Sequence, residues 1–223
     1  MKLLSTSNAK IVKGEKLGYM TAGLHLAPYT LSGKNVCSHA SKGCAFACLN
    51  TSGMGIFKNV QAARIAKTQF FWDNKEAFLL QLEKELTSFI KKCAKKNMIP
   101  AIRLNLTSDL PWENYGIMEK FPNVQFYDYS KVPNRFINKV LPANYHLTFS
   151  RSESNEETAK LISNMGHNVA VVFANELPQT YWGKPVVNGD ETDLRFLDGK
   201  GSIVGLSMKG KAKHDETGFV VRG

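Results

Sequence analysis

Cysteine is scarce in this chain of 223 residues, and its four cysteines are unevenly placed. Cys37, Cys44 and Cys48 lie within twelve residues, whereas Cys93 lies far from them. This distribution does not fit a framework of paired disulfides. In a reducing cytosol, clustered cysteines more often bind metal or carry out redox chemistry. We therefore take the three clustered residues as candidate metal ligands and Cys93 as incidental.

Long apolar runs are also absent. Residues 1–16 are polar and do not resemble a signal peptide, and no stretch approaches the roughly 18 apolar residues that a membrane span needs. Internal repeats and heptad patterns are lacking as well. With 43% hydrophobic residues the chain can bury a full core. We expect a soluble cytoplasmic protein that forms a single domain over residues 1–223, without membrane contact.

Acidic residues are few in the first part of the chain. Residues 1–100 contain 15 Lys or Arg against 5 Asp or Glu, and the remainder contains 14 of each, so the whole net charge of +10 belongs to the first part. Such asymmetry favours attraction to nucleic acid or another polyanion. A solvated basic helix explains it equally well, because the run of lysines at 91–96 suits the negative end of a helix dipole.

Short apolar strands alternate with helical stretches along most of the chain. This alternation predicts parallel β/α units and an α/β fold. Seven strands are fewer than a complete eight-fold barrel has, so we expect an incomplete (β/α) barrel of parallel strands, with a doubly wound open sheet as the alternative. The predicted strands cover residues 18–28, 101–107, 124–129, 145–150, 168–174, 184–188 and 202–207, and the predicted helices cover 57–70, 75–96, 112–121, 132–140 and 154–165.

The cysteine loop, at about residues 33–55, has the spacing C-x6-C-x3-C. Thiolates are soft ligands that suit iron-sulfur clusters and zinc. Structural zinc sites usually have four protein ligands and two-residue spacings between paired cysteines, which are absent here. Three cysteines therefore indicate a 4Fe-4S cluster with one iron open to a small molecule. His39 offers the alternative of a fourth ligand that would close the site and favour zinc.

The loop follows the first predicted strand and precedes the first predicted helix. In parallel β/α folds, ligand sites form from the loops at the carboxyl ends of strands. A strand, a three-cysteine loop and then a helix resemble the radical S-adenosylmethionine enzymes, whose usual spacing of C-x3-C-x2-C differs from that seen here. The resemblance implies a 4Fe-4S cluster whose open iron chelates the amino acid end of S-adenosylmethionine.

Several short motifs are also similar to those of the phage gene product 88 family. They comprise Val36-Cys37, Gly43-Cys44, Ala47 to Gly53, Ala63-Arg64, Lys67-Thr68, Arg103 to Asn105, Ser108-Asp109 and Asp190 to Asp198. This resemblance covers most of the chain. It implies a phage-borne protein in the cytoplasm of the host cell.

Polar side chains gather after the second of these strands, at Asn105, Thr107, Ser108 and Asp109. A pocket beside the cysteines would collect them. By analogy with the radical enzymes, Asn105, Thr107 and Ser108 would bind the cofactor near its amino group. Asp109 is a candidate ligand or general acid-base, and it also fits the N-cap of a helix that begins near Pro111.

Two later strands add further candidates. Asp128 lies in an aromatic strand, where a carboxylate is costly to bury unless a cation such as Arg103, Lys131 or Arg151 pairs with it. We take Asp128 as a second catalytic candidate, with a structural ion-pair network as the alternative. Ser150 and Arg151, at the end of the next strand, are candidates for binding a polar cofactor or substrate.

Three functions remain open on this sequence. The first is an iron-sulfur enzyme of radical type that acts on a nucleotide, nucleic acid or small metabolite. The second is a phage nucleic-acid-binding protein without catalysis, in which the metal only stabilises the loop. The third is a magnesium-dependent hydrolase that uses the acidic segment from Asp190 to Asp198, although such a segment is more often a solvated loop.

Overall fold

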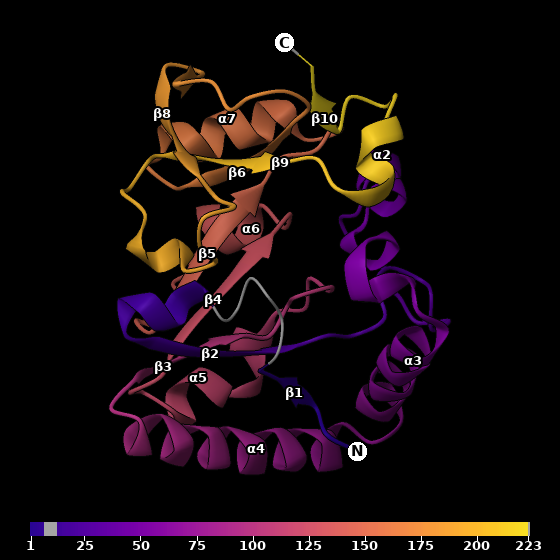
Figure 1. Cartoon of the computed structure of the whole chain (residues 1–223), viewed down its shortest axis with the longest axis vertical. Helices are drawn as coiled ribbons and strands as arrows, with labels where there is room; N and C mark the ends of the chain where they lie inside the picture. The colour runs from indigo at the N-terminus through magenta and orange to yellow at the C-terminus, as the bar shows by residue number, and fades with distance from the viewer. Residues whose placement is uncertain (7–12, 223) are drawn as a thin grey trace.

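A computed structural model describes residues 1–6 and 13–222 of the chain. In this part, ten strands form one sheet with the order β1-β2-β3-β4-β5-β6-β9-β8-β7, and β10 pairs with β6 beside this path. Figure 1 shows the strands stacked from β2 and β3 near α4 to β6 and β9 near α7. The strands are β1 (Leu4–Ser5), β2 (Tyr19–Leu24), β3 (Ile99–Arg103), β4 (Gln125–Ser130), β5 (Tyr145–Ser150), β6 (Val169–Phe173), β7 (Thr180–Tyr181), β8 (Lys184–Asn188), β9 (Ile203–Ser207) and β10 (Val220–Val221).

Two long helices cover one end of the sheet, and shorter helices connect the strands. The α-helices are α2 (Lys42–Phe46), α3 (Lys58–Asp73), α4 (Lys75–Lys95), α5 (Ile117–Lys120), α6 (Asn134–Ile137) and α7 (Glu156–Asn164). The 3-10 helices are η1 (Lys13–Leu17), η2 (Leu49–Thr51), η3 (Gly53–Ile56), η4 (Trp112–Tyr115), η5 (Arg195–Leu197) and η6 (Gly210–His214). None of the helices described is long and apolar enough to cross a membrane.

The prediction of an incomplete barrel of parallel strands is wrong. The sheet is mixed, because β1 and β7 pair antiparallel with β2 and β8 while the other pairs are parallel. It is also open: among the described residues, its edge strands β1 and β7 do not pair with each other. The alternation of strand and helix ends after β6. There β7 and β8 follow each other through the tight turn at Trp182 and Gly183, both with positive φ.

Apolar residues at helical spacing explain how α4 is attached. Phe78, Leu82, Leu86, Phe89 and Cys93 form its buried side. An Asn74 side chain caps the helix by accepting the Ala77 N–H at 3.0 Å. Cys93 is fully buried in the main core cluster and does not line the cavity that the three loop cysteines share.

The branching of β6 shapes the region where the parallel strands end. β6 pairs with β5 at Val169 and Ala170, but its carboxyl end pairs with β10 at Val172 and Phe173. β5 ends at Ser150, which pairs with Ala170, so β10 takes its place beside the carboxyl-terminal half of β6. The C-terminal segment that leads into β10 brings Phe219 to the strand ends.

Candidate metal centre

The carboxyl ends of the parallel strands open into a cavity of about 230 Å³. Residues that follow β2, β3, β4, β5 and β9 line it, and so do all three cysteines of the loop. The sequence had predicted ten site residues, and eight of them meet here: Cys37, Cys44, Cys48, Asn105, Thr107, Ser108, Asp109 and Ser150. Asp128 and Arg151 do not line the cavity.

The first cysteine is held by short-range hydrogen bonds. The Cys37 N–H donates to Asn35 Oδ1 at 2.8 Å, and Cys37 Sγ accepts from the Tyr29 N–H at 3.4 Å. The Asp109 N–H donates to the Val36 carbonyl at 2.8 Å and so ties the loop to the segment after β3. The position of Cys37 therefore depends on two loops that are far apart in sequence.

The second cysteine belongs to α2, whose start is fixed from outside the loop. Ser41 caps the helix by accepting the Cys44 N–H at 3.1 Å. Glu153 accepts from Ser41 Oγ and from the Gly43 N–H, both at 2.7 Å. A Cβ at Gly43 would lie 2.1 Å from Thr217 Oγ1, so only glycine allows this approach. Sequence reasoning missed the role of Glu153, because nothing in its local pattern marks a partner 112 residues away.

The third cysteine lies above a buried arginine. Arg64, from α3, is 8% exposed and donates through Nη1 to Asn50 Oδ1. The N–H of Asn50 bonds the Cys48 thiol, and Arg64 adds a favourable charge for its ionised form. Arg64 therefore supports the loop from α3.

Burial keeps two of the thiols neutral in the absence of a cation. Burial, aided by negative charge at Asp109, Cys48 and Cys44 and opposed by the Tyr29 N–H, raises the pKa of Cys37 to about 12. Burial likewise raises the pKa of Cys48. These mutual effects show that the three sulfurs share one environment. Metal ligation requires thiolates, so binding here would release protons and strengthen as the pH rises.

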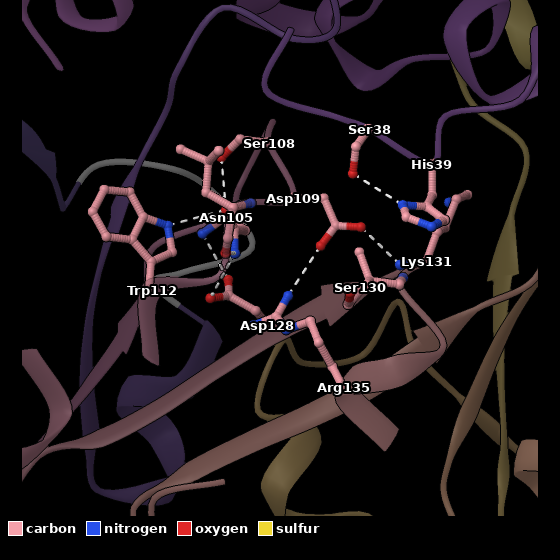
Figure 2. A network of polar contacts seen from close by, with 12 residues as sticks. Ser38, His39, Asn105, Ser108, Asp109, Trp112, Asp128, Ser130, Lys131 and Arg135 are labelled. Atoms are coloured by element: carbon pink, nitrogen blue, oxygen red, sulfur yellow. Dashed lines mark hydrogen bonds and ion pairs between the residues drawn. The ribbon is translucent and has the colours of Figure 1, made fainter. Parts of the chain in front are cut away.

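The soft donors that line the cavity are the three thiols, and the two carboxylates beside them, Asp109 and Asp190, form ion pairs within the protein. His39 is exposed, does not line the cavity, and contacts Ser38 Oγ through Nδ1 at 2.9 Å. In Figure 2 the two side chains point toward each other. Within residues 1–6 and 13–222, no three His, Cys, Asp or Glu side chains converge closely enough to hold a single ion. All three thiols nevertheless line the same cavity.

Asn105 is the centre of a polar network beneath the cavity (Figure 2). Its Oδ1 accepts from Ser108 Oγ, the Leu110 N–H and Trp112 Nε1, at 2.8, 2.9 and 3.1 Å. Its Nδ2 donates to the Leu110 carbonyl at 2.9 Å and to Asp128. These contacts use the polar atoms of its side chain. Asn105 and Ser108 thus shape the cavity wall.

Asp128 is buried in the same network. Its carboxylate accepts from the Asn105 N–H at 2.7 Å and from Tyr145 Oη at 2.9 Å, and it lies 3.9 Å from Arg103 Nε. These contacts match the ion-pair network that the sequence offered as the alternative to a catalytic role. Burial raises the pKa of Asp128 to about 7, against the lowering effect of Arg103.

The protonation of Asp128 has a measurable consequence for stability. The unfolded chain releases this proton near pH 3.8 and the folded chain near pH 7, so between these values the native state binds more protons. Its contribution to the free energy of unfolding is present below about pH 4 and is lost as the pH rises to about 7. Urea unfolding of the wild type and Asp128→Asn between about pH 5 and pH 8 tests this. We expect wild-type stability to fall with pH relative to the variant, and parallel curves would contradict the assignment.

Asp109 is also occupied by protein contacts, as Figure 2 shows. One carboxylate oxygen accepts the Lys131 N–H at 2.8 Å, and the other lies 3.1 Å from Arg135 Nη1. The prediction that it caps a following helix is wrong: Pro111 occupies that position and no side chain caps η4. Asp109 instead joins the loops after β3 and β4.

The remaining predicted cofactor residues have separate partners. Thr107 Oγ1 donates to the Leu26 carbonyl at 2.6 Å. Ser150 Oγ accepts from Lys131 Nζ at 2.7 Å, and both residues line the cavity. Arg151 donates to the Phe219 carbonyl at 3.0 Å and pairs with Glu156. It therefore holds the C-terminal segment in place and does not face the cavity.

Three of the four carboxylates in the acidic segment after β8 are paired with cations. Asp193 accepts from Arg103 Nη1 at 2.9 and 3.0 Å, and both side chains are buried. Asp190 lies 2.5 Å from Lys209 Nζ, and Asp198 lies 3.2 Å from Arg195. The three carboxylates thus belong to three different ion pairs.

Comparison with curated proteins and with solved structures finds no match to this chain. A family model does match, over residues 2–223, and its description is Gene product 88. The match covers almost the entire chain and includes the cysteine loop, the strand ends and the acidic segment. The similarity expected from the short motifs is confirmed, and the protein belongs to the Gene product 88 family.

Proposed function

We propose that the protein is an iron-sulfur enzyme in which Cys37, Cys44 and Cys48 bind a 4Fe-4S cluster that acts on S-adenosylmethionine. The observation that carries the proposal is the single cavity, at the carboxyl ends of parallel strands, that all three cysteines line. Sites in open parallel sheets form at this edge. Cys93, which is buried on α4, does not line this cavity and is not among the proposed ligands.

The donor set fits a cluster better than a single zinc ion. Structural zinc usually has four protein ligands, and the lining of this cavity offers three cysteines and no histidine. A cubane presents its ligands on separate irons, so its thiolates can stand apart around the cluster. Three thiolates would leave one iron without a protein ligand. That iron would be open to a molecule entering the cavity.

The residues around the cysteines provide positive charge and hydrogen-bond donors for a cluster held by three thiolates. Arg64 is buried beneath the loop, and Lys131 lines the cavity near Cys48. The N–H groups of Tyr29 and Asn50 bond the sulfurs of Cys37 and Cys48. Hydrogen bonds to sulfur and nearby positive charge both raise the reduction potential of a cluster. The chain therefore provides conditions in which the cluster can be reduced.

Reductive cleavage of S-adenosylmethionine is the chemistry that the bound cluster would supply: one electron enters the sulfonium, the C5′–S bond breaks, and methionine and a 5′-deoxyadenosyl radical form. Lys131 Nζ provides a positive charge for the cofactor's carboxylate, with Ser150 Oγ beside it. The Phe219 ring, 5.7 Å from Lys131 Nζ, closes the cavity on the side of the C-terminal segment. The Asn105 network holds the cavity wall, and Asp109 holds the backbone of Lys131.

Product analysis tests this function. The protein, reconstituted under anaerobic conditions and reduced with dithionite, should convert S-adenosylmethionine to 5′-deoxyadenosine and methionine. Lys131→Met should lower kcat/KM roughly tenfold or more, because a charge-assisted hydrogen bond is lost. Lys34→Met, at an exposed position of the cysteine loop, is the matched control and should have no effect.

If the protein binds the cluster but forms no 5′-deoxyadenosine, the assignment to S-adenosylmethionine chemistry is wrong. The alternative, a nucleic-acid-binding protein whose metal only staples the loop, predicts a different result. Its binding to DNA or RNA would weaken steeply with salt, and S-adenosylmethionine would not bind. A gel shift across a salt series, made on the same preparation, separates the two functions.

A further inference from the structure

Exposed apolar side chains are concentrated on the outer side of the cysteine loop. Within the described residues, 17 large hydrophobic side chains are exposed, and five of these lie within the twelve residues from 46 to 57. The five, which we call the apolar rim, are Phe46, Leu49, Met54, Ile56 and Phe57, with exposed fractions between 43% and 68%. Single exposed apolar residues are normal, but a concentration of this kind marks an interaction site.

The apolar rim is attached directly to the candidate ligands. Phe46 ends α2, the helix that carries Cys44. Leu49 follows Cys48, lines the cavity and is also half exposed. A molecule that covers the rim would therefore lie within a few residues of two candidate thiolate ligands.

Lysines surround the rim, and acidic residues are absent from its segment. Between Glu15 and Asp73 the chain has six Lys or Arg and no Asp or Glu. Lys42 and Lys58, on either side of the rim, are exposed. This part of the surface is therefore positively charged over a long stretch of sequence.

The C-terminal segment adds positive charge to the same surface. A Cβ at Gly210 would lie 2.7 Å from Ser52 Cβ, so η6 packs directly on the loop. Lys211 Nζ lies 5.8 Å from the centre of the Phe46 ring. Figure 1 shows the yellow C-terminal segment beside α2. Lys211 and Lys213 are exposed, Lys209 pairs with Asp190, and the next acidic residues along the chain are the buried Asp215 and the exposed Glu216.

The composition of this surface favours a protein over a nucleic acid. Protein–nucleic acid interfaces are polar, favour arginine for phosphate contacts and use aromatic rings for base stacking. Here the exposed cations are lysines, Arg64 is buried, and three of the five rim residues are aliphatic. An apolar centre with Met and Phe, bordered by charge, is typical of protein–protein interfaces. Because the lysines that border the rim are positively charged, the partner that fits this surface is acidic.

We propose that the apolar rim and its lysines dock an acidic electron-transfer protein, of iron-sulfur or flavin type, which reduces the cluster. This inference rests on the proposed function, because cleavage of the sulfonium consumes one electron. In the docking step the partner is oxidised by one electron, the cluster gains that electron, and no covalent bond forms or breaks. Weak electron-transfer complexes of this kind are small and depend on charge for fast association.

Stopped-flow reduction of the reconstituted protein tests the docking site. The probes are a reduced acidic ferredoxin and dithionite, and the signal is the bleaching of the cluster's visible absorbance. Met54→Ser with Ile56→Ser, and separately Lys211→Glu with Lys213→Glu, should each slow reduction by ferredoxin about tenfold at low salt. Reduction by dithionite should keep its wild-type rate. Lys91→Glu with Lys92→Glu, on α4, is the matched charge control and should have no effect.

The outcomes separate this inference from the proposed function. A protein that takes up no iron and sulfide refutes the proposed function before docking is measured. A loaded cluster that ferredoxin reduces equally fast in the wild type and both rim variants refutes the docking site alone. Protection of the apolar rim by a single-stranded oligonucleotide, and not by ferredoxin, would also overturn the inference and assign the surface to nucleic acid.

Discussion

Replacing Cys37, Cys44 or Cys48 by serine is expected to abolish iron and sulfide uptake. A serine hydroxyl is a hard donor that stays protonated near neutral pH, so it does not substitute for a soft thiolate at iron. The three thiols share one cavity, so two remaining ligands would leave the cluster half bound. Iron and acid-labile sulfide analysis after anaerobic reconstitution measures the loss.

Cys93 provides the matched control for these variants. It is the fourth cysteine of the chain and lies buried in the last turns of α4, away from the cavity. Cys93→Ala should keep the wild-type iron content, although removal of its buried sulfur is expected to cost about 1 kcal/mol of stability. Equal iron loss in all four variants would show that the effect is unfolding, and retention of iron in a loop variant would remove that cysteine from the ligand set.

Replacing Asp193 by asparagine is expected to lower the free energy of unfolding by about 3 kcal/mol, because the buried Arg103 guanidinium loses its closest charged partner and keeps only the more distant Asp128. The side chains are 9% and 1% exposed, so water does not compensate for the loss. Urea unfolding at pH 7 provides the measurement. Glu191→Gln, an exposed change in the same acidic segment, should stay within about 0.5 kcal/mol of the wild type.

This experiment also bears on the hydrolase hypothesis for residues 190–198. If Asp193 were held for a magnesium ion, the variant would lose Mg²⁺ binding and keep its stability. If Asp193 is an ion-pair partner, stability falls and added Mg²⁺ has no effect on either protein. The geometry, with Asp190, Asp193 and Asp198 each in a separate ion pair, favours the second result.

The sequence predicts the strands of the parallel region well. Hydrophobic runs bounded by turn residues place β4, β5, β6, β8 and β9 within a residue or two of their positions. Helices were predicted less well where a backbone feature interrupts them. The helix expected over 112–121 divides into η4 and α5, because Gly116 between them adopts a positive φ of 68°.

The arrangement of the sheet was beyond the reach of periodicity. β9 lies between β6 and β8 because of pairing between distant segments, and no local pattern encodes that choice. The short edge strands β1, β7 and β10 have two residues each, which is too few for an alternation to be visible. The barrel prediction was wrong because it did not include β1 and β7, which pair antiparallel at the two edges of the open sheet.

The candidate site was predictable where spacing and strand position agree. Eight of the ten predicted site residues line the cavity because the carboxyl ends of parallel strands meet at one edge. Asp128 and Arg151 follow the alternation of a strand and point elsewhere, one into the Asn105 network and one to the C-terminal segment. Glu153 and Arg64, which hold the loop, act through contacts that only the folded chain creates.

The measurement that tests the central claim most directly is the iron, acid-labile sulfide and zinc content of the wild-type protein after anaerobic reconstitution, together with its electron paramagnetic resonance spectrum after reduction. The account predicts about four iron and four sulfide per chain, and a reduced-cluster signal that changes when S-adenosylmethionine is added. One zinc per chain with no sulfide, and no signal on reduction, would contradict it.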